Sequence, residues 1–343
     1  MPDSPQPLFH FIKFISQEGT TECELTVMCK GKRFIVIMCA DSFKDSPAIL
    51  QEYVKFLNIV EDDFEGANTS DEGLTIDDFY DWVMEPFHAI LEDLPPVSGR
   101  LTLQDYFFGE VFYYTLHLHE GERLPLKSDQ GEDFRWGTQI SPEFHFDLPV
   151  FNPRQVESLE DNQDTKPFKV LADGTICFLK YFRWGDDRTA EREIIAYTSI
   201  KRADLPKDVL VASLHGVVRT DDGLILGLLL SYIDCDNGNL EWAMDNVAPR
   251  NLRERWGGQI TYTLKSLHEA GIIWGDAKAA NVLIDGNQDA WIVDFGGSYT
   301  EGWVDKEKAG TIQGDFQGLA KILDHLSINS EVSEMPLVDL LSV

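Results

Sequence analysis

The feature that most constrains the fold is an ordered run of apolar and polar blocks between residues 252 and 296. Residues 252–270 repeat apolar side chains at helical spacing and predict a long amphipathic helix. A polar loop follows, in which Asp276 stands five residues before Asn281. Two short apolar runs, NVLID and AWIVDF, then predict a small β-hairpin that ends at Asp294. We therefore expect the polar side chains of the loop and of the hairpin end to converge on one site.

A second predicted hairpin lies upstream and carries a lysine. The run PFKVLADGTICFLKYF alternates about the tetrapeptide ADGT, which puts Lys180 on the second strand. The next segment, DRTAEREIIAYTSI, has helical spacing and contains Glu191 and Glu193. We prefer Glu193 as the partner of the lysine, because Ile194 and Tyr197 then lie on the core side of the helix. Glu191 remains the alternative, since the sequence pattern does not fix the exact register of a helix.

Composition places the chain among globular proteins. Its 343 residues, 43% of them hydrophobic, are enough for two domains with separate cores. No apolar run reaches the roughly 18 residues of a membrane helix. The early run LFHFIKFIS lacks the basic region and the cleavage site of a signal peptide. The five cysteines form no CxxC pair, so we expect a reduced intracellular protein, cytoplasmic or nuclear, without a zinc site.

The charge is strongly acidic and unevenly distributed. The formal net charge is −30, and residues 1–165 hold 32 acidic against 11 basic residues. Such a field repels nucleic acid and anionic lipid, so we expect no nucleic acid and no membrane as a partner. We favour the interpretation that the charge keeps the protein soluble. A basic protein partner for the N-terminal half is the alternative.

The N-terminal part mixes strands and helices. Residues 8–39 alternate apolar and polar side chains around a Lys-Gly-Lys turn and predict strands. Residues 46–58 and 75–93 have helical spacing, and Thr75 with Asp78 resembles a capping box. The segment 101–116 fits a strand or a helix.

No motif of known chemistry occurs in this N-terminal part. We predict an α+β module over residues 1–140, of unknown role. Residues 125–165 are rich in Pro, Asp, Glu and Gln without sustained periodicity, and we expect a linker there.

Taken in order, the polar residues of the two hairpin regions resemble the protein-kinase signature set. That set has a lysine on a strand, a glutamate on the following helix, an Asp-x-x-x-x-Asn loop and an Asp-Phe-Gly. The stretches GDAKAANVLID and IVDFGG carry the specific part of the resemblance, which covers about residues 150–330. It implies an α+β chain in which a bilobal protein-kinase-like domain follows the N-terminal module. The N-lobe, a β-sheet plus one helix, would span residues 150–235, and a shortened, mainly helical C-lobe would span residues 236–343.

The resemblance also implies ATP and Mg²⁺ as cofactors. Lys180 would hold the α- and β-phosphates, and Glu193 would orient its amine. Asn281 and Asp294 would supply the oxygen ligands that Mg²⁺ prefers.

Two further residues would act on the acceptor hydroxyl. The transferred phosphoryl group carries charge on three oxygens, so catalysis of this kind is mostly positioning and neutralisation. Asp276 would align the hydroxyl and accept its proton, and Lys278 would reach the transferred phosphate.

The loop departs from the usual His-Arg-Asp pattern. It reads Trp274-Gly275-Asp276, and this form is similar to aminoglycoside- and choline-kinase-type phosphotransferases. Lys278 is instead similar to the Ser/Thr protein-kinase form. Because no arginine precedes the aspartate, we do not expect activation by a phosphorylated loop.

Other departures lie on either side of the loop. No G-x-G-x-x-G precedes Lys180, and residues 150–174 hold a single glycine. Only 20 residues separate Asp294 from Asp315, with no Ala-Pro-Glu. Asp315 resembles the helix aspartate that braces the catalytic loop, and we also predict it as the N-cap of the last helix. The compact domain with its acidic N-terminal module resembles a fungal kinase-like group.

Several nearby polar and aromatic residues have simpler interpretations. We interpret His268 as a packed residue at a helix end, Trp274 as part of the core and Asp285 as a turn residue.

Three function classes follow. The first is an ATP-dependent phosphotransferase acting on a hydroxyl, either of a Ser/Thr residue or of a small molecule. The second is a pseudokinase that binds nucleotide or protein, which the missing glycine-rich loop favours. The third, a hydrolase, has little support, because the chain contains neither G-x-S-x-G nor HExxH.

Overall fold

The computed structural model describes residues 8–16, 19–64, 74–129, 131, 135–141, 148–162, 164–235, 238–245, 248–297 and 299–326. The chain forms two compact units. The N-terminal unit comprises Met1–Phe134 and Arg154–Pro167, and the C-terminal unit comprises Arg135–Pro153 and Phe168–Val343. The backbone therefore passes between the units three times, where we had expected a simple linker over residues 125–165.

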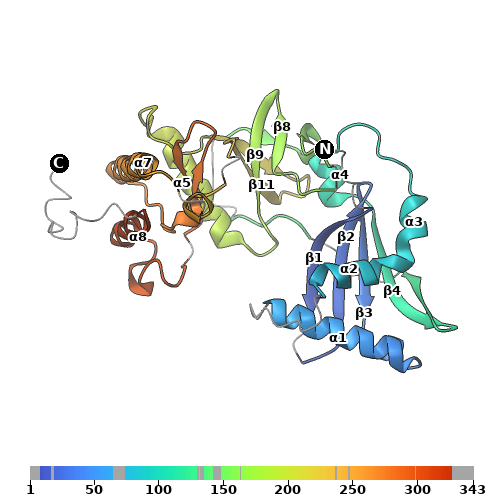
Figure 1. The fold of residues 1–343 in the computed structure, drawn as a ribbon. Coiled ribbons are helices and arrows are strands. Elements are labelled where there is room, and N and C mark those ends of the chain that lie inside the picture. Colours follow the sequence, from blue (N-terminus) through green and yellow to red (C-terminus); the bar gives the residue numbers. More distant parts are fainter. Residues whose placement is uncertain are drawn as a thin grey trace. The chain divides into compact units, whose positions relative to one another are not determined.

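The N-terminal unit is built on a five-stranded sheet in the order β1-β2-β3-β4-β5 (Figure 1). The pairing of β3 with β4 is parallel and the other pairings are antiparallel. Lys30 and Gly31 have positive φ angles of 48° and 72°, which the tight turn between β2 and β3 requires. The strands are β1 (His10–Ser16), β2 (Cys23–Cys29), β3 (Lys32–Met38), β4 (Val111–His119) and β5 (Glu122–Ser128).

Helices cover one face of this sheet, as Figure 1 shows for α1 and α2. Alternate strand residues such as Leu25 and Phe34 point toward them and form a core with Tyr53, Phe79 and Trp82, all buried. The helices of this unit are α1 (Pro47–Phe64), α2 (Ile76–Met84), the 3-10 turn Glu85–Phe87, α3 (His88–Glu92) and α4 (Leu103–Phe108).

The capping box predicted from Thr75 and Asp78 is confirmed, because each residue bonds the backbone N–H of the other. The undecided segment 101–116 contains a helix and then a strand, α4 and the first part of β4. The short strand β7 (Val156–Ser158) lies beside α4, with Ser158 N–H donating to Leu101 O.

The first part of the C-terminal unit is a sheet with one helix. Neighbouring strands follow the order β6-β10-β11-β9-β8. Strand β9 lies between β8 and β11 and carries Lys180, which pairs in register with Leu228. The elements are β6 (Val150–Phe151), β8 (Lys169–Ala172), β9 (Thr175–Tyr181), α5 (Asp187–Arg202), β10 (Leu214–Arg219) and β11 (Ile225–Ser231).

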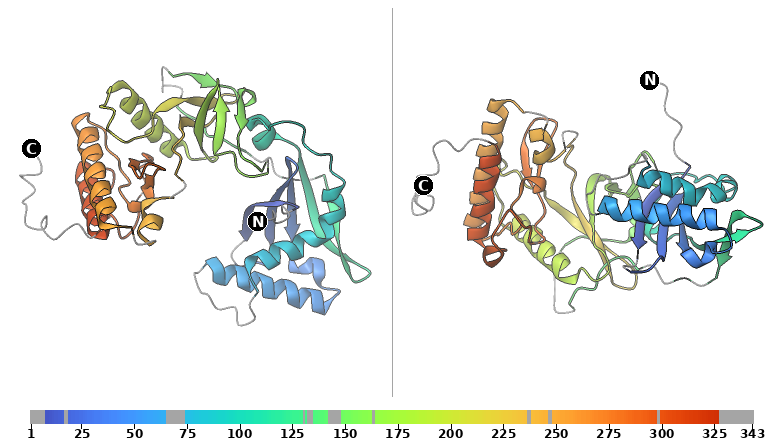
Figure 2. Two further views of the ribbon diagram at one scale, coloured as in Figure 1. Left: turned by 45° about the horizontal axis from the view of Figure 1, so that its top comes forward. Right: turned by 60° about the horizontal axis from the view of Figure 1, so that its bottom comes forward.

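The second part of this unit is mainly helical. Figure 1 shows α7 and α8 end on and next to each other, and in both views of Figure 2 they overlap along their lengths, in agreement with their contacts. The buried Trp256 and Trp274 donate from their indole nitrogens to Gln288 O and Val293 O, which joins α7 and the loop to the small hairpin. The elements are α6 (Leu240–Asp245), α7 (Arg250–Glu269), β12 (Val282–Ile284), β13 (Ala290–Ile292) and α8 (Ile312–His325).

The α+β fold class is confirmed, while the predicted start of the last helix is wrong. Thr311 is the N-cap of α8, because its side chain accepts the N–H of Gly314. Asp315 lies inside the helix and is 1% exposed. All five cysteines carry free thiols. Among the described residues, none belongs to a helix long and apolar enough to cross a membrane.

Candidate functional site

The first half of the site is an ion-pair cluster around Lys180. Its Nζ donates to Oε1 of Glu193 and lies 2.8 Å from Oδ1 of Asp294. Phe295 adds a backbone N–H to the same Glu193 oxygen, at 3.2 Å. One cation from β9 is thus held between a carboxylate of α5 and a carboxylate that follows β13.

Helical spacing explains why Glu193 reaches this position. Ala190, Ile194 and Tyr197 form the buried face of α5, and Glu193 lies on the same face with none of its surface exposed. Glu191 points elsewhere and accepts the backbone N–H of Ser141 at 3.0 Å. The structure therefore brings Glu193, and not Glu191, to the lysine.

Burial and charge shift the pKa values of Lys180, Glu193 and Asp294, and the balance between the two effects differs among these groups. Burial opposes a charged Lys180, but the two carboxylates outweigh it and raise the pKa of the amine. Burial also dominates at Glu193 and raises the pKa of its carboxyl to about 7 despite the lysine. At Asp294, burial is outweighed by Lys180, which lowers the pKa of this carboxyl. Lys180 and Asp294 are therefore the charged pair near neutral pH, and burial favours the protonated form of Glu193.

The second half of the site is the loop after α7. Asp276 is 5% exposed, and its Oδ2 lies 2.8 Å from Nζ of Lys278. Asn281 donates from Nδ2 to the backbone oxygen and to Oδ2 of Asp276, at 2.9 and 3.0 Å. The short 3-10 turn Ala279–Asn281 brings these residues together. All three polar residues predicted in this loop thus form one hydrogen-bonded group.

Asp315 braces this loop from α8. Its two carboxylate oxygens accept the backbone N–H groups of Trp274 and Gly275, both at 2.8 Å, and Oδ2 also bonds Nε2 of His268 at 2.8 Å. Gly275 adopts φ +84°, a backbone conformation that side chains rarely allow. Gly318 of α8 lets the helix approach the loop, because a Cβ there would meet Ala277 O at 2.3 Å. The bracing role expected for Asp315 therefore matches its contacts.

Thr300 contacts two of the site residues, and the sequence did not predict its place there. Its Oγ1 donates to Oδ1 of Asp276 at 3.2 Å and accepts from Nζ of Lys278 at 2.9 Å. Trp303 donates a backbone N–H to Thr300 O at 3.2 Å, which closes a turn at this point. The sequence holds no signal for this contact, because the segment between β13 and α8 has no regular spacing.

The small hairpin aligns the two halves. Val282 pairs with Ile292, and Val293 N–H donates to Asn281 O at 3.1 Å, so Asn281 and Asp294 flank the same end of the hairpin. Asp294 has φ +65°, a strained conformation for a residue with a side chain.

The donor chemistry fits Mg²⁺ held together with a nucleotide. Asp294 offers carboxylate oxygens, and both hydrogen bonds of the Asn281 amide use its nitrogen. Within the described ranges, no group of three or more His, Cys, Asp or Glu side chains could hold a metal alone. Mg²⁺ commonly takes only one or two protein ligands and completes its shell with phosphate oxygens and water. A further buried oxygen, Oε2 of Glu193, has no hydrogen-bond partner among the described residues.

None of these side chains lines either of two cavities found among the described residues. One, of about 480 Å³, is lined by residues of α7 and of the segment after α5, including Leu205 and Tyr262. The other, of about 390 Å³, lies in the N-terminal unit.

Comparison with models of known protein families gives no match. The chain is similar to the cytokinesis protein sepH of Aspergillus terreus, with 32% identity over 136 residues, and to that of Aspergillus niger, with 30% identity over 139 residues. It is also similar to the serine/threonine-protein kinase OXI1 of Arabidopsis thaliana, with 27% identity over 138 residues.

These similarities cover only parts of each protein. The match to either sepH covers 35% of this chain and 10% of the relative, and the match to OXI1 covers 40% of this chain and 32% of the relative. The chain thus spans a small part of the length of the curated relatives that it matches. Similarity of this extent is consistent with the protein-kinase-like superfamily.

Proposed function

We propose that this protein is an ATP-dependent phosphotransferase that moves the γ-phosphate of Mg-ATP to a hydroxyl acceptor. The observation that carries the proposal is the position of Lys180 Nζ between Glu193 and Asp294. A lysine fixed in this way is a charged amine that points at a carboxylate able to hold a metal. Phosphoryl transfer needs this combination, because its catalysis is mostly positioning and charge neutralisation.

Lys180 would bind the α- and β-phosphates, with Glu193 holding the amine in place when the nucleotide enters. Asp294 and Asn281 would hold Mg²⁺, which supplies positive charge to the phosphate oxygens when bound.

On the acceptor side, Oδ1 or Oδ2 of Asp276 would take the proton of the attacking hydroxyl. The hydroxyl oxygen then bonds the γ-phosphorus as the bond to the bridging oxygen breaks, and ADP leaves. Lys278, 2.8 Å from Asp276, would balance the charge on the transferred group. Asp315 would hold the loop in shape through its two backbone hydrogen bonds.

The bilobal organisation, with an N-lobe over residues 150–235 and a shortened C-lobe over residues 236–343, is part of the same proposal. Four features bear on the acceptor, two in favour of each class. The Gly275-Asp276 pair and the short segment before α8 favour a small molecule. Lys278 and the similarity to OXI1 favour a Ser/Thr side chain.

A pseudokinase is the second candidate, and one observation favours it. A glycine-rich loop lets the backbone come close enough to a nucleotide to cover its phosphates. Residues 150–179, which precede Lys180, contain a single glycine, Gly174, and it lies in the turn between β8 and β9. In that case the chain would act as a nucleotide-binding or protein-interaction module.

Mg-ATP binding and turnover test both candidates. Ligand at a hundredfold excess over its Kd stabilises the folded state by about 2.7 kcal/mol, which a thermal melt detects. We expect this shift in the native chain and its loss in Asp294→Ala. ADP release that stops in Asp276→Asn, with the shift retained, supports the phosphotransferase. A shift without any ADP release supports the pseudokinase, and no shift at millimolar Mg-ATP contradicts both nucleotide-dependent functions.

A further inference from the structure

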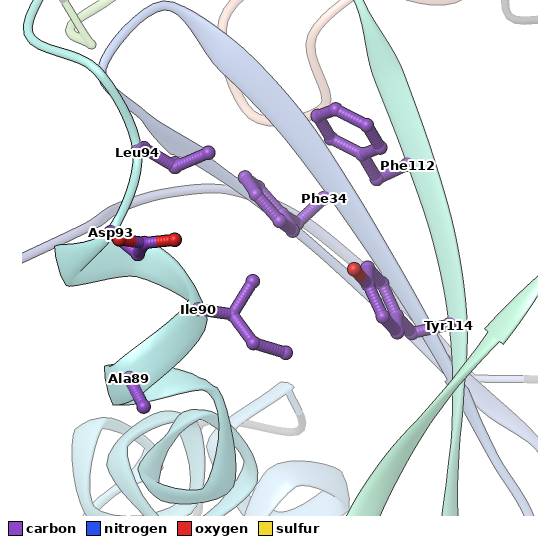
Figure 3. Close-up of a pocket in the computed structure, with 7 residues that line it drawn as sticks. All are labelled: Phe34, Ala89, Ile90, Asp93, Leu94, Phe112 and Tyr114. Atoms are coloured by element: carbon purple, nitrogen blue, oxygen red, sulfur yellow. The ribbon is translucent and has the colours of Figure 1, made fainter.

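A feature independent of the phosphotransferase site is the cavity of about 390 Å³ in the N-terminal unit. Figure 3 shows three aromatic rings from the sheet facing side chains from α3 and the residue pair that follows it. Six of the seven lining residues are uncharged and mostly apolar, and Asp93 is the exception. The lining residues are Phe34, Ala89, Ile90, Asp93, Leu94, Phe112 and Tyr114.

The walls of this cavity are held firmly. Lys30 reaches from the turn after β2 and donates from Nζ to the backbone oxygens of Leu91, Glu92 and Leu94, at 3.0, 2.9 and 2.8 Å. These bonds fix the end of α3 and the residues beyond it. A cavity that is already formed loses little conformational entropy when it is filled, which favours binding.

The aromatic wall is equally constrained. Phe34 is 1% exposed and stacks against Tyr114, with ring centroids 6.1 Å apart, and lies 5.2 Å from Phe112. Phe87 packs edge-on against Tyr114, with ring centroids 5.2 Å apart. Rings packed in this way offer a large apolar surface at fixed geometry.

The two sides of the cavity differ in charge. Asp93 is exposed, its carboxylate pairs with no cation of the described residues, and in Figure 3 one of its oxygens points toward the space beside Phe34. At the other side, Lys127 lies over the Phe112 ring, 5.0 Å from its centroid. Lys32 lies 5.8 Å from the same ring and is paired with Glu110. The cavity is therefore negative toward α3 and positive toward β5.

The charge of the whole unit indicates the partner. The residues of the N-terminal unit include 30 Asp and Glu against 11 Lys and Arg. Such a field attracts basic proteins and speeds their association. A cavity near 400 Å³ is at the lower end of binding pockets, with room for one or two side chains rather than a large ligand.

We propose that this cavity binds a segment of a basic partner protein, which inserts an aromatic or branched aliphatic side chain between α3 and the sheet. A lysine or arginine next to this anchor pairs with Asp93. The anchor supplies affinity by burying apolar surface, and the acidic unit supplies steering and orientation.

Fluorescence anisotropy of the full chain with labelled hexapeptides tests the proposal. The first peptide has a central Phe-Leu pair flanked by two arginines on each side. The second has the same arginines around Ser-Ser, and the third has glutamates around Phe-Leu. We expect the first to bind at least about tenfold more tightly than the second, since a buried Phe or Leu contributes roughly 1.5–3 kcal/mol. We expect no binding of the third.

Three surface variants locate the binding. Asp93→Asn removes only a charge and should weaken the first peptide roughly two- to fivefold. Lys127→Glu removes a repelling cation and should strengthen it by a similar factor. Ala89→Trp fills the mouth of the cavity from an exposed position and should abolish the preference for Phe-Leu. Glu52→Gln, on the exposed side of α1, serves as the matched control and should leave the affinity unchanged.

Circular dichroism establishes that each variant is folded before its affinity is compared. Equal binding of the Phe-Leu and Ser-Ser peptides would show that only the general acidic field attracts them, and would overturn the proposal. It is also overturned if Asp93→Asn and Lys127→Glu leave the affinity of the first peptide unchanged, or if this peptide does not bind.

Discussion

The hydroxyl of Thr300 donates a hydrogen bond to Oδ1 of Asp276, 24 residues earlier in the chain, across 3.2 Å. Oγ1 of Thr300 also accepts from Nζ of Lys278 at 2.9 Å, and this Nζ lies 2.8 Å from Oδ2 of Asp276, so the three side chains form a closed group. A hydroxyl at this place orients both the Asp276 carboxylate and the Lys278 amine, the two groups that we propose act on the acceptor hydroxyl and the transferred phosphate. It also ties the segment after β13 to the loop after α7.

Thr300 should therefore act as a positioning residue for phosphoryl transfer. Thr300→Val keeps the shape but removes both hydrogen bonds, and we expect kcat to fall about ten- to a hundredfold, as for other losses of alignment. The KM for ATP should change little, and Thr300→Ser should restore most of the rate. Steady-state kinetics of the three proteins provide the measurement. Full turnover in Thr300→Val would assign the contact a structural role only.

Asp276 should be needed for turnover and not for nucleotide binding. Removing a positioned proton acceptor costs about 10²–10⁴ in rate. Asp276→Asn keeps the size of the side chain, and we expect a loss within this range with the Mg-ATP melting shift intact. Asp222→Asn, on an exposed turn of the same unit, is the control. If Asp276→Asn turns over at the native rate, the assignment of the base is wrong.

Glu193 should make the nucleotide-free protein less stable as the pH rises from about 4.5 to about 7. Its carboxyl has a pKa of about 7 in the folded protein against 4.5 in the unfolded chain, so the folded state binds more protons within this window. The stabilisation is complete below the lower value and lost above the upper one, and amounts to at most about 3 kcal/mol. Burial is the main cause, and it is only partly offset by Lys180.

Urea unfolding from pH 4.5 to pH 8 measures this effect. Glu193→Gln cannot titrate, so its stability should fall less steeply over the window than that of the native chain. Parallel curves for the two proteins would mean that the carboxyl stays ionised throughout.

Asp315 should be required for the stability of the loop. Its oxygens accept two backbone N–H groups and the His268 ring in a nearly fully buried site. Asp315→Asn replaces one acceptor by a donor that faces an N–H, and an unsatisfied buried group costs about 1–3 kcal/mol. We expect a lower urea midpoint by that amount, together with slower turnover. An unchanged midpoint would argue that the loop holds its shape without this brace.

Local patterns in the sequence were sufficient for most elements of the fold. The capping box of Thr75 and Asp78 and the hairpin turns at Lys30 and Asp173 depend on residues a few positions apart. Such neighbours meet whatever the rest of the chain does. Asp315 shows the limit of this reasoning: its place near a helix start suggested an N-cap, whereas Thr311 caps α8 and Asp315 turns inward to the loop.

The sequence by itself determined that Lys180 lies on a strand, Asp276 in a loop and Asp294 at the end of a hairpin. Hairpin and helix periodicities along the chain are enough to place these elements. Only the tertiary structure decided that Glu193 rather than Glu191 meets Lys180, that Thr300 meets Asp276, and that aromatic rings and Asp93 frame a cavity. Each of these contacts joins segments that are distant in sequence or irregular in backbone. Periodicity favoured Glu193 by the face of its helix, but whether this side chain meets Lys180, and how the other contacts form, depends on how helices and sheets pack.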